Sequence, residues 1–252
     1  MSPLARITAV IFAILVMAPL AFSAQRAVST PERLLFEALN RERAALGLSM
    51  LVWNDSLASA ARQHAERMAQ RNKLSHQLPG EPDLRMRAAG TGARFSMVAE
   101  NVAIGPDAAV IHSGWMHSHG HRANILSPEL SAVGIAVVPR GAELFAVQDF
   151  SQAVPNLNLN QQEQQVRPLL AARGLQIIAR NSEARKSCDS DGGFAANRPA
   201  LVARYETTNL KDLPTDLERK IQSGRYRAAA VGACSVEDAR GFTLFRITIL
   251  LY

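Results

Sequence analysis

The sequence predicts a protein of the α+β class, because helical and strand patterns occupy separate stretches of the chain. Residues 30–46 and 55–72 carry apolar side chains with the period of an α-helix, and residues 108–116 form a third helical stretch. Residues 132–138 and 143–150 are instead rich in β-branched and apolar side chains. Helices followed by an antiparallel hairpin are typical of a sheet that is covered by helices.

The ends of these elements carry their own signals. Thr30 can cap the first helix, Pro31 suits its first position, and Gly47 ends it. The second helix is expected to reach Asn72, with its apolar residues on one inner face. The turn at 139–141 joins the two strand patterns into a hairpin.

A polar stretch at 156–165 predicts a boundary between two domains. The first domain is expected to cover residues 25–155. The second, residues 156–252, is expected to form a small α+β region, because helical patterns alternate with strand-like runs in it. No internal repeat between the two regions is visible in the sequence, and the second region resembles no family that we recognise.

The chain begins with a targeting signal. Arg6 precedes the apolar run 7–22, and small residues follow before the chain turns polar, which is the order of a secretory signal peptide at residues 1–24. The run is shorter than the roughly 20 residues that span a bilayer, so an uncleaved anchor is the weaker alternative. We expect a secreted or periplasmic protein with no transmembrane span in the mature chain.

The charge pattern argues against a nucleic-acid partner. The formal net charge is +6, but the basic residues are scattered and are not interleaved with aromatic ones. The simplest interpretation is a solvated surface. A further alternative is that the more basic C-terminal region attaches the protein to an anionic envelope.

The two cysteines, Cys188 and Cys234, both lie in the second region. In an exported protein an even count of two most simply predicts one disulfide. A metal pair or two free thiols are the alternatives, although no CxxC spacing supports either.

Six histidines occur, and three of them stand at alternate positions in the run GWMHSHGHRANIL. His76, Glu100 and His121 could share a site, since imidazoles bind metals and a carboxylate can accept a proton. Taken without their surroundings, such histidines are more often surface or capping residues, and a glutamate followed by asparagine is more often a buried hydrogen-bond anchor.

The order of the surrounding blocks is more informative. LNRERAALGLSMLVW, LASAARQHAERMAQRNKLSH, AENVAIG, GWMHSHGHRANIL, AVGIAVV and LFAVQDF together resemble the CAP superfamily of cysteine-rich secretory, antigen 5 and pathogenesis-related 1 proteins, in its bacterial SCP-like extracellular branch. The resemblance covers about residues 32–152. It implies a three-layer α-β-α sandwich for this region.

The resemblance also implies a cleft. Its two histidines correspond to His76 and His121, which would bind Zn²⁺ or Cu²⁺, and its glutamate corresponds to Glu100. The family's second acidic residue has no counterpart between residues 115 and 124, so we expect a His-Glu-His triad. Asn101 is expected to line the same cleft.

Other residues of the histidine run are open to two interpretations. In an extended chain His117, His119 and His121 would project to one side and enlarge a metal site; the alternative is that His117 and His119 face solvent without a ligand role. Arg122 and Asn124 are expected to brace this loop through hydrogen bonds. His64 and His112 are expected at helix surfaces, and Trp115 in the core.

Two functions compete. The resemblance implies a secreted binding protein that holds a divalent metal and engages a lipid, envelope or protein ligand. The alternative is a metal-assisted hydrolase with Glu100 as general base. Ser75 adjoins His76, but neighbours in sequence rarely form a nucleophile and base pair, and both cysteines lie outside the recognised motifs, which favours binding.

Overall fold

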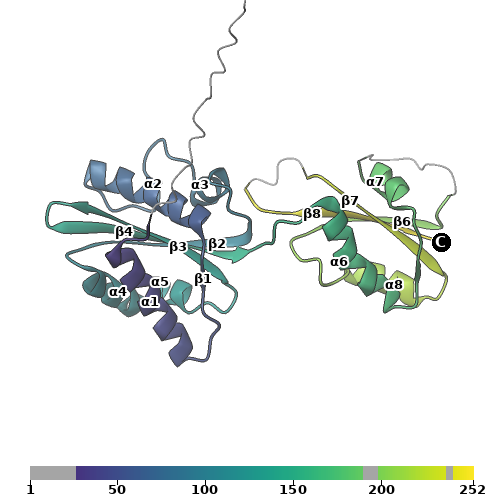
Figure 1. Ribbon diagram of the computed structural model, residues 1–252, viewed down its shortest axis with the longest axis horizontal. Coiled ribbons are helices and arrows are strands. Elements are labelled where there is room, and N and C mark those ends of the chain that lie inside the picture. Colours follow the sequence, from purple (N-terminus) through teal and green to yellow (C-terminus); the bar gives the residue numbers. More distant parts are fainter. Residues whose placement is uncertain (1–26, 190–197, 237–240) are drawn as a thin grey trace, which may run out of the picture.

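The computed structural model describes residues 27–189, 198–236 and 241–252, and the predicted signal peptide at 1–24 lies outside these residues. The chain forms two units, each built on a four-stranded sheet (Figure 1). We call residues 30–153 the first unit and residues 159–251 the second unit. Among the described residues, no helix is both long and apolar enough to cross a bilayer.

The first unit is a three-layer α-β-α sandwich, as predicted. Its strand order is β1-β3-β4-β2, with β1 parallel to β3 and the other neighbours antiparallel. Helices α1, α4 and α5 cover one face of the sheet, and α2 and α3 cover the other (Figure 1). The elements are α1 (Thr30–Ala45), β1 (Val52–Trp53), α2 (Asp55–Arg71), α3 (Leu84–Gly90), β2 (Phe95–Gly105), α4 (Ala108–His117), α5 (His119–Ile125), β3 (Ala132–Arg140) and β4 (Glu143–Ala153).

Local signals explain where the first helices begin and end. The cap of α1 is Ser29, one residue before the expected Thr30, and its backbone N–H donates to the carboxylate of Glu32 at 2.7 Å. The side chain of Asn54 caps α2 by accepting from the backbone of Leu57. The same helix ends at Asn72, which has a left-handed φ of 49°.

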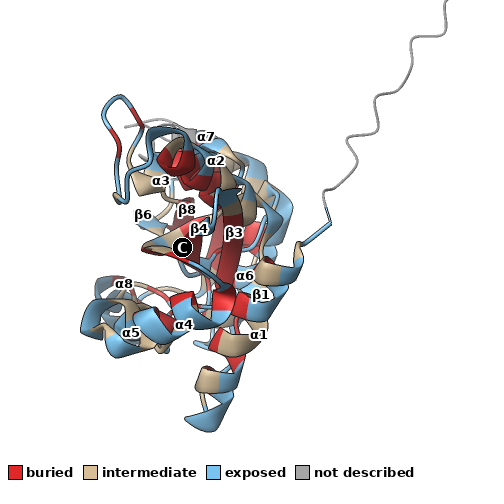
Figure 2. Cartoon of the chain, turned by 90° about the vertical axis from the view of Figure 1, so that its left-hand side faces the viewer, coloured by how far each residue is buried: buried red, intermediate tan, exposed pale blue. Residues whose placement is uncertain are grey.

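Close packing of α2 on the sheet depends on one glycine. A Cβ atom at Gly134 in β3 would lie 1.9 Å from the backbone nitrogen of Ala58. Only glycine therefore lets the helix approach the strand this closely. Buried residues follow the strands and the inner faces of the helices, and exposed residues follow the outer faces (Figure 2). Trp115 is 1% exposed, in the core as predicted.

The second unit has a sheet of order β5-β7-β8-β6, with α6 and α8 on one face and α7 on the other (Figure 1). The helix predicted at 215–223 and the closing β-rich runs are present, whereas α7 was not predicted. The elements are α6 (Leu159–Ala171), β5 (Gln176–Ile177), α7 (Asn181–Asp189), β6 (Leu201–Thr207), α8 (Thr215–Gln222), β7 (Ala228–Cys234) and β8 (Phe245–Leu251).

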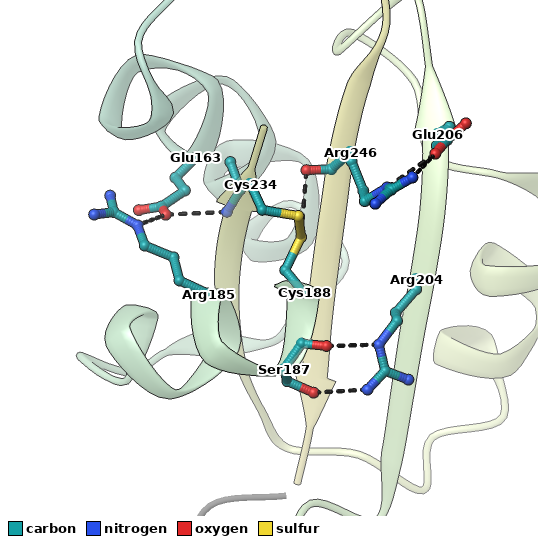
Figure 3. The surroundings of a disulfide bond; sticks show 9 residues. Glu163, Arg185, Ser187, Cys188, Arg204, Glu206, Cys234 and Arg246 are labelled. Atoms are coloured by element: carbon teal, nitrogen blue, oxygen red, sulfur yellow. Dashed lines mark hydrogen bonds and ion pairs between the residues drawn. A yellow bond between two sulfur atoms is a disulfide. The ribbon is translucent and has the colours of Figure 1, made fainter. Parts of the chain in front are cut away.

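The predicted disulfide is confirmed. Cys188 in α7 and Cys234 in β7 are bonded, with Cα atoms 5.9 Å apart (Figure 3). The bond ties the helix of one layer to the sheet beneath it. Both half-cystines are buried, so the alternatives of a metal pair and of free thiols are wrong.

One contact between the units involves the start of β2. The backbone N–H of Thr243 donates to the carbonyl of Phe95 at 2.8 Å, and the N–H of Phe95 donates to the Thr243 hydroxyl at 3.1 Å. The rings of Phe95 and Phe242 meet edge to face, with centroids 5.8 Å apart. The second unit therefore covers the beginning of the strand that carries Glu100.

Candidate functional site

The predicted site residues converge at β2, an edge strand of the first sheet. Glu100 lies in β2, His76 follows α2, and His121 lies in α5. The ring centroids of the two histidines are 6.4 Å apart, and Nδ1 of His76 is 2.9 Å from Oε1 of Glu100. His76 is 24 residues from Glu100 and 45 residues from His121 in the sequence, and the fold brings these segments together.

His76 is held by its neighbours although its side chain is 61% exposed. Its carbonyl accepts a hydrogen bond from the Arg87 guanidinium at 3.2 Å. The hydrogen bond to Glu100 raises the pKa of His76, and partial burial opposes this effect. Because Nδ1 faces Glu100, Nε2 is the ring nitrogen left to bind a ligand.

Glu100 is buried, and both of its carboxylate oxygens are engaged. Oε1 faces His76, and Oε2 accepts from the guanidinium of Arg87. Nε2 of His64 lies 3.8 Å from Oε2. The carboxylate is therefore fixed between a buried cation and the exposed imidazole.

His64 belongs to this buried network, so its predicted place at a helix surface is wrong. The side chain is completely buried, and Nδ1 lies 2.9 Å from each oxygen of Glu81. Its Nε2 donates to the carbonyl of Ser75 at 2.8 Å, one residue before His76. His64 thus anchors the segment that presents His76. Its place on the inner, apolar face of the predicted helix was the signal available.

Two asparagines hold the backbone next to His121 and Glu100. The side chain of Asn101 donates to the carbonyl of His121 at 3.1 Å, and Asn124 donates to the Glu100 carbonyl and to Asn101 Oδ1. Asn124 therefore braces the loop as predicted. Burial, together with the charge of His76, lowers the pKa of His121, so its imidazole is neutral near neutral pH.

Arg122 does not share this bracing role, contrary to prediction. It is exposed, and within the described parts of the chain its guanidinium makes no hydrogen bond or ion pair. The buried Arg43 of α1 fills the role instead, donating to the carbonyls of Ile125 and Ser127 at 2.8 Å and of Leu130 at 3.3 Å. A basic residue at an apolar position of the first helix was the signal for it.

The expectation that His117 and His119 line up with His121 in an extended chain is wrong. His117 ends α4, and the other two lie in α5, where residues two apart project about 200° from one another. Nδ1 of His117 bonds to the carbonyl of Ser113 at 2.7 Å. Both His117 and His119 are exposed, which agrees with the alternative interpretation. His112 is half-buried on α4, 3.6 Å from Glu42 of α1.

Asp149 in β4 is an acidic neighbour that the sequence did not single out. It stands opposite Glu100 in the antiparallel pair β2–β4 and is completely buried. Burial, and then the charge of Glu100, raises the pKa of Asp149 well above its ordinary range. A protonated Asp149 can donate a hydrogen bond to Glu100, which two carboxylates could not share.

Two protein ligands are available for a metal. Within the described residues, no three His, Cys, Asp or Glu side chains are arranged to hold an ion together. His76 and His121 remain as a pair of imidazoles, and neither ring nitrogen of His121 is engaged by the residues described. An ion bound by both would keep open positions for water or for a ligand.

Comparison with known proteins identifies the family of the first unit. The CAP family model, described as the cysteine-rich secretory protein family, matches residues 36–150, which include His76, Glu100 and His121. Residues 36–150 are a CAP domain. The resemblance found in the sequence is therefore confirmed, and the site described above lies within the CAP domain.

Two curated relatives of the CAP domain are proteins of Bacillus subtilis. Uncharacterized protein YkwD of Bacillus subtilis is 34% identical over 125 residues, which cover 48% of this chain and 47% of that protein. Uncharacterized membrane protein YlbC of the same species is 29% identical over 110 residues, or 43% of this chain and 32% of that one. The chain thus spans about half of the first relative and a third of the second. A crystal structure of an extracellular SCP-domain protein from Bacillus anthracis is 28% identical with a TM-score of 0.46, covering 48% of this chain and 40% of that one.

Proposed function

We propose that this chain is an exported binding protein whose CAP domain holds a Zn²⁺ or Cu²⁺ ion between His76 and His121. The observation that carries the proposal is the approach of the two rings to 6.4 Å, with Glu100 bonded to Nδ1 of His76. Metal–nitrogen bonds of about 2.0 Å from each ring can bridge this separation after small side-chain rotations.

The residues around the pair suit this task. Glu100 would hold the orientation of the His76 ring, as carboxylates do behind metal-binding histidines. His121 is neutral near neutral pH and so already has the form that coordinates. When bound, the ion would supply a Lewis-acidic centre with open positions, and a lipid, envelope or protein ligand with an exposed oxygen or nitrogen could occupy them.

Binding is favoured over hydrolysis by the state of Glu100. A general base needs a free oxygen to take a proton from water. Here Oε1 is bonded to His76 and Oε2 to Arg87, so protein groups already hold both oxygens. The sequence signals for export support placing this activity outside the cytoplasm, where sequencing the N-terminus of the mature protein would check removal of residues 1–24.

The test is a calorimetric titration of the full mature chain with ZnCl₂ or CuCl₂. His76→Ala and His121→Ala should each weaken binding by at least about tenfold, whereas His117→Ala is the matched control on the same surface and should bind as wild type does. The raised pKa of His76 means that protons compete with the ion as soon as the pH falls toward the histidine range, so affinity should drop steeply from about pH 7.5 to 5.5. Equal affinity of wild type and both cleft variants would refute the proposal.

A further inference from the structure

The second unit repeats the fold of the first. Both sheets have a two-residue edge strand parallel to the first strand of a hairpin, and both are closed by an antiparallel strand on the far side. The order of elements also agrees once α3 and α5 are set aside: α1, β1, α2, β2, α4, β3 and β4 correspond to α6, β5, α7, β6, α8, β7 and β8. The helices lie on corresponding faces in Figure 1. The expectation that no repeat relates the two regions is therefore wrong.

Strand pairing makes the correspondence specific to single residues. Val52 pairs with Ala132 in the first sheet, and Gln176 pairs with Ala228 in the second, so position 132 corresponds to 228. Counting along the strands, the core residues Val133, Ile135 and Val137 then match Ala229, Val231 and Ala233, and each set packs under the equivalent helices.

A buried glutamate confirms this register. Glu32 of α1 accepts the N–H of Val137 and pairs with Arg62 of α2. Glu163 of α6 accepts the N–H of Ala233 at 3.1 Å and pairs with Arg185 of α7 at 2.5 Å (Figure 3). Both strand N–H groups lie four residues beyond the last residue that pairs with the short parallel edge strand. The same residue types therefore solve the same problem at equivalent positions.

The two units differ at the strand pairs that contain Glu100 and Asn101. In the first unit the cross-strand pairs are Glu100 with Asp149 and Asn101 with Gln148. At the equivalent positions the second unit has Val202 with Leu250 and Ala203 with Ile249. The fold is thus built equally well with four apolar residues at these places.

The second unit shows that the fold does not require a carboxylate at the position of Asp149. Asp149 is completely buried opposite Glu100, and neither of its oxygens has a hydrogen-bond partner among the described residues. A buried carboxyl group in that position opposes folding, whereas Leu250 contributes apolar burial. Asp149 is not required by the fold and lowers its stability, so we infer that it has a role in the site.

We propose that Asp149 is a positioning residue, which holds the Glu100 carboxylate against His76 at the expense of fold stability. Asp149 is the cross-strand neighbour of Glu100, so a protonated Asp149 can donate a hydrogen bond to the Glu100 carboxylate. A role of Asp149 in metal binding rests on the proposed function. Its effects on stability and on the surroundings of His76 do not.

The test compares Asp149→Leu with Asp149→Asn in the full mature chain, without metal. Leucine is the residue of the second unit, so Asp149→Leu should raise the melting temperature of the first unit by about 3 °C. Tryptophan fluorescence reports this unit alone, because Trp53 and Trp115 both lie in it. The pKa of His76, followed by NMR, should fall toward its ordinary value in Asp149→Leu and stay raised in Asp149→Asn, since asparagine can still donate to Glu100.

Leu250→Asp is the matched control in the second unit. It should lower the melting temperature of that unit by about 10 °C, seen in the ring signals of Tyr205, Tyr226 and Tyr252. A destabilised or unfolded Asp149→Leu would show that Asp149 is structural and would overturn the proposal. An unchanged His76 pKa in that variant would overturn it as well. Neither readout uses metal, so a chain that binds no Zn²⁺ would refute the proposed function and leave this inference standing.

Discussion

Replacing Arg87 with methionine should remove the main partner of a buried charge. The side chains of Arg87 and Glu100 are each 3% exposed, and Arg87 also donates to the carbonyl of His76. Removing one member of a buried ion pair costs about 3–5 kcal/mol, because the other charge is left uncompensated. For a chain of this size about 1 kcal/mol corresponds to roughly 2–4 °C, so the first unit should melt about 10 °C lower.

The assay is thermal unfolding followed by tryptophan fluorescence, with Arg67→Met as the control. Arg67 pairs with Glu81 at 3.1 Å, but its side chain is 42% exposed, so its loss should cost no more than about 1 kcal/mol. Adding Glu100→Gln to Arg87→Met should restore part of the stability, since it removes the uncompensated charge. If Arg87→Met loses no more stability than Arg67→Met, the buried network does not organise the cleft as described.

Four further predictions follow from the same contacts. Gly134→Ala should lower the stability of the first unit by about 1–3 kcal/mol or more in chemical denaturation, because its Cβ would meet the backbone of α2. Reduction of Cys188–Cys234, which closes a separation of 46 residues, should cost the second unit about 4 kcal/mol, measured by unfolding with and without reductant. A chain of residues 25–155 should unfold cooperatively but at a lower temperature than the full chain, because Phe95 loses its contacts with Phe242 and Thr243; a soluble product without a cooperative transition would contradict the predicted boundary. A panel of peptide and ester substrates should be turned over no faster by wild type than by Glu100→Gln, and a loss of about 100-fold in that variant would favour the hydrolase instead.

Much of the first unit could be predicted from sequence because its signals are local. The caps, the helical periods and the turn of the hairpin each depend on residues within a few positions of one another. His76 and His121 were predicted as site residues from the order of the motif blocks. His64, Arg87 and Asp149 were missed because their roles depend on partners 13 or more residues away, which a periodic pattern cannot show.

The repeat was invisible for a related reason. A fold is specified by where apolar residues fall and by a few special contacts, and many sequences satisfy both. Glu32 and Glu163 play one role, but the residues around them are otherwise different. The conformation of the histidine run was predicted wrongly for a separate reason. Ser118 is the N-cap residue of a new helix, α5, directly after α4 ends, where an extended segment was expected.

The short edge strands β1 and β5 have a consequence for how copies of this protein meet. Each covers only two residues of its neighbour, so N–H groups further along β3 and β7 face an edge where a strand from another molecule could pair. Glu32 and Glu163 accept the N–H groups of Val137 and Ala233, four residues beyond the last paired ones, and the charge of each glutamate is paired inside the same chain. A strand that paired along this edge as far as Val137 or Ala233 would have to displace a buried carboxylate from its partners, which opposes edge-to-edge pairing at that end.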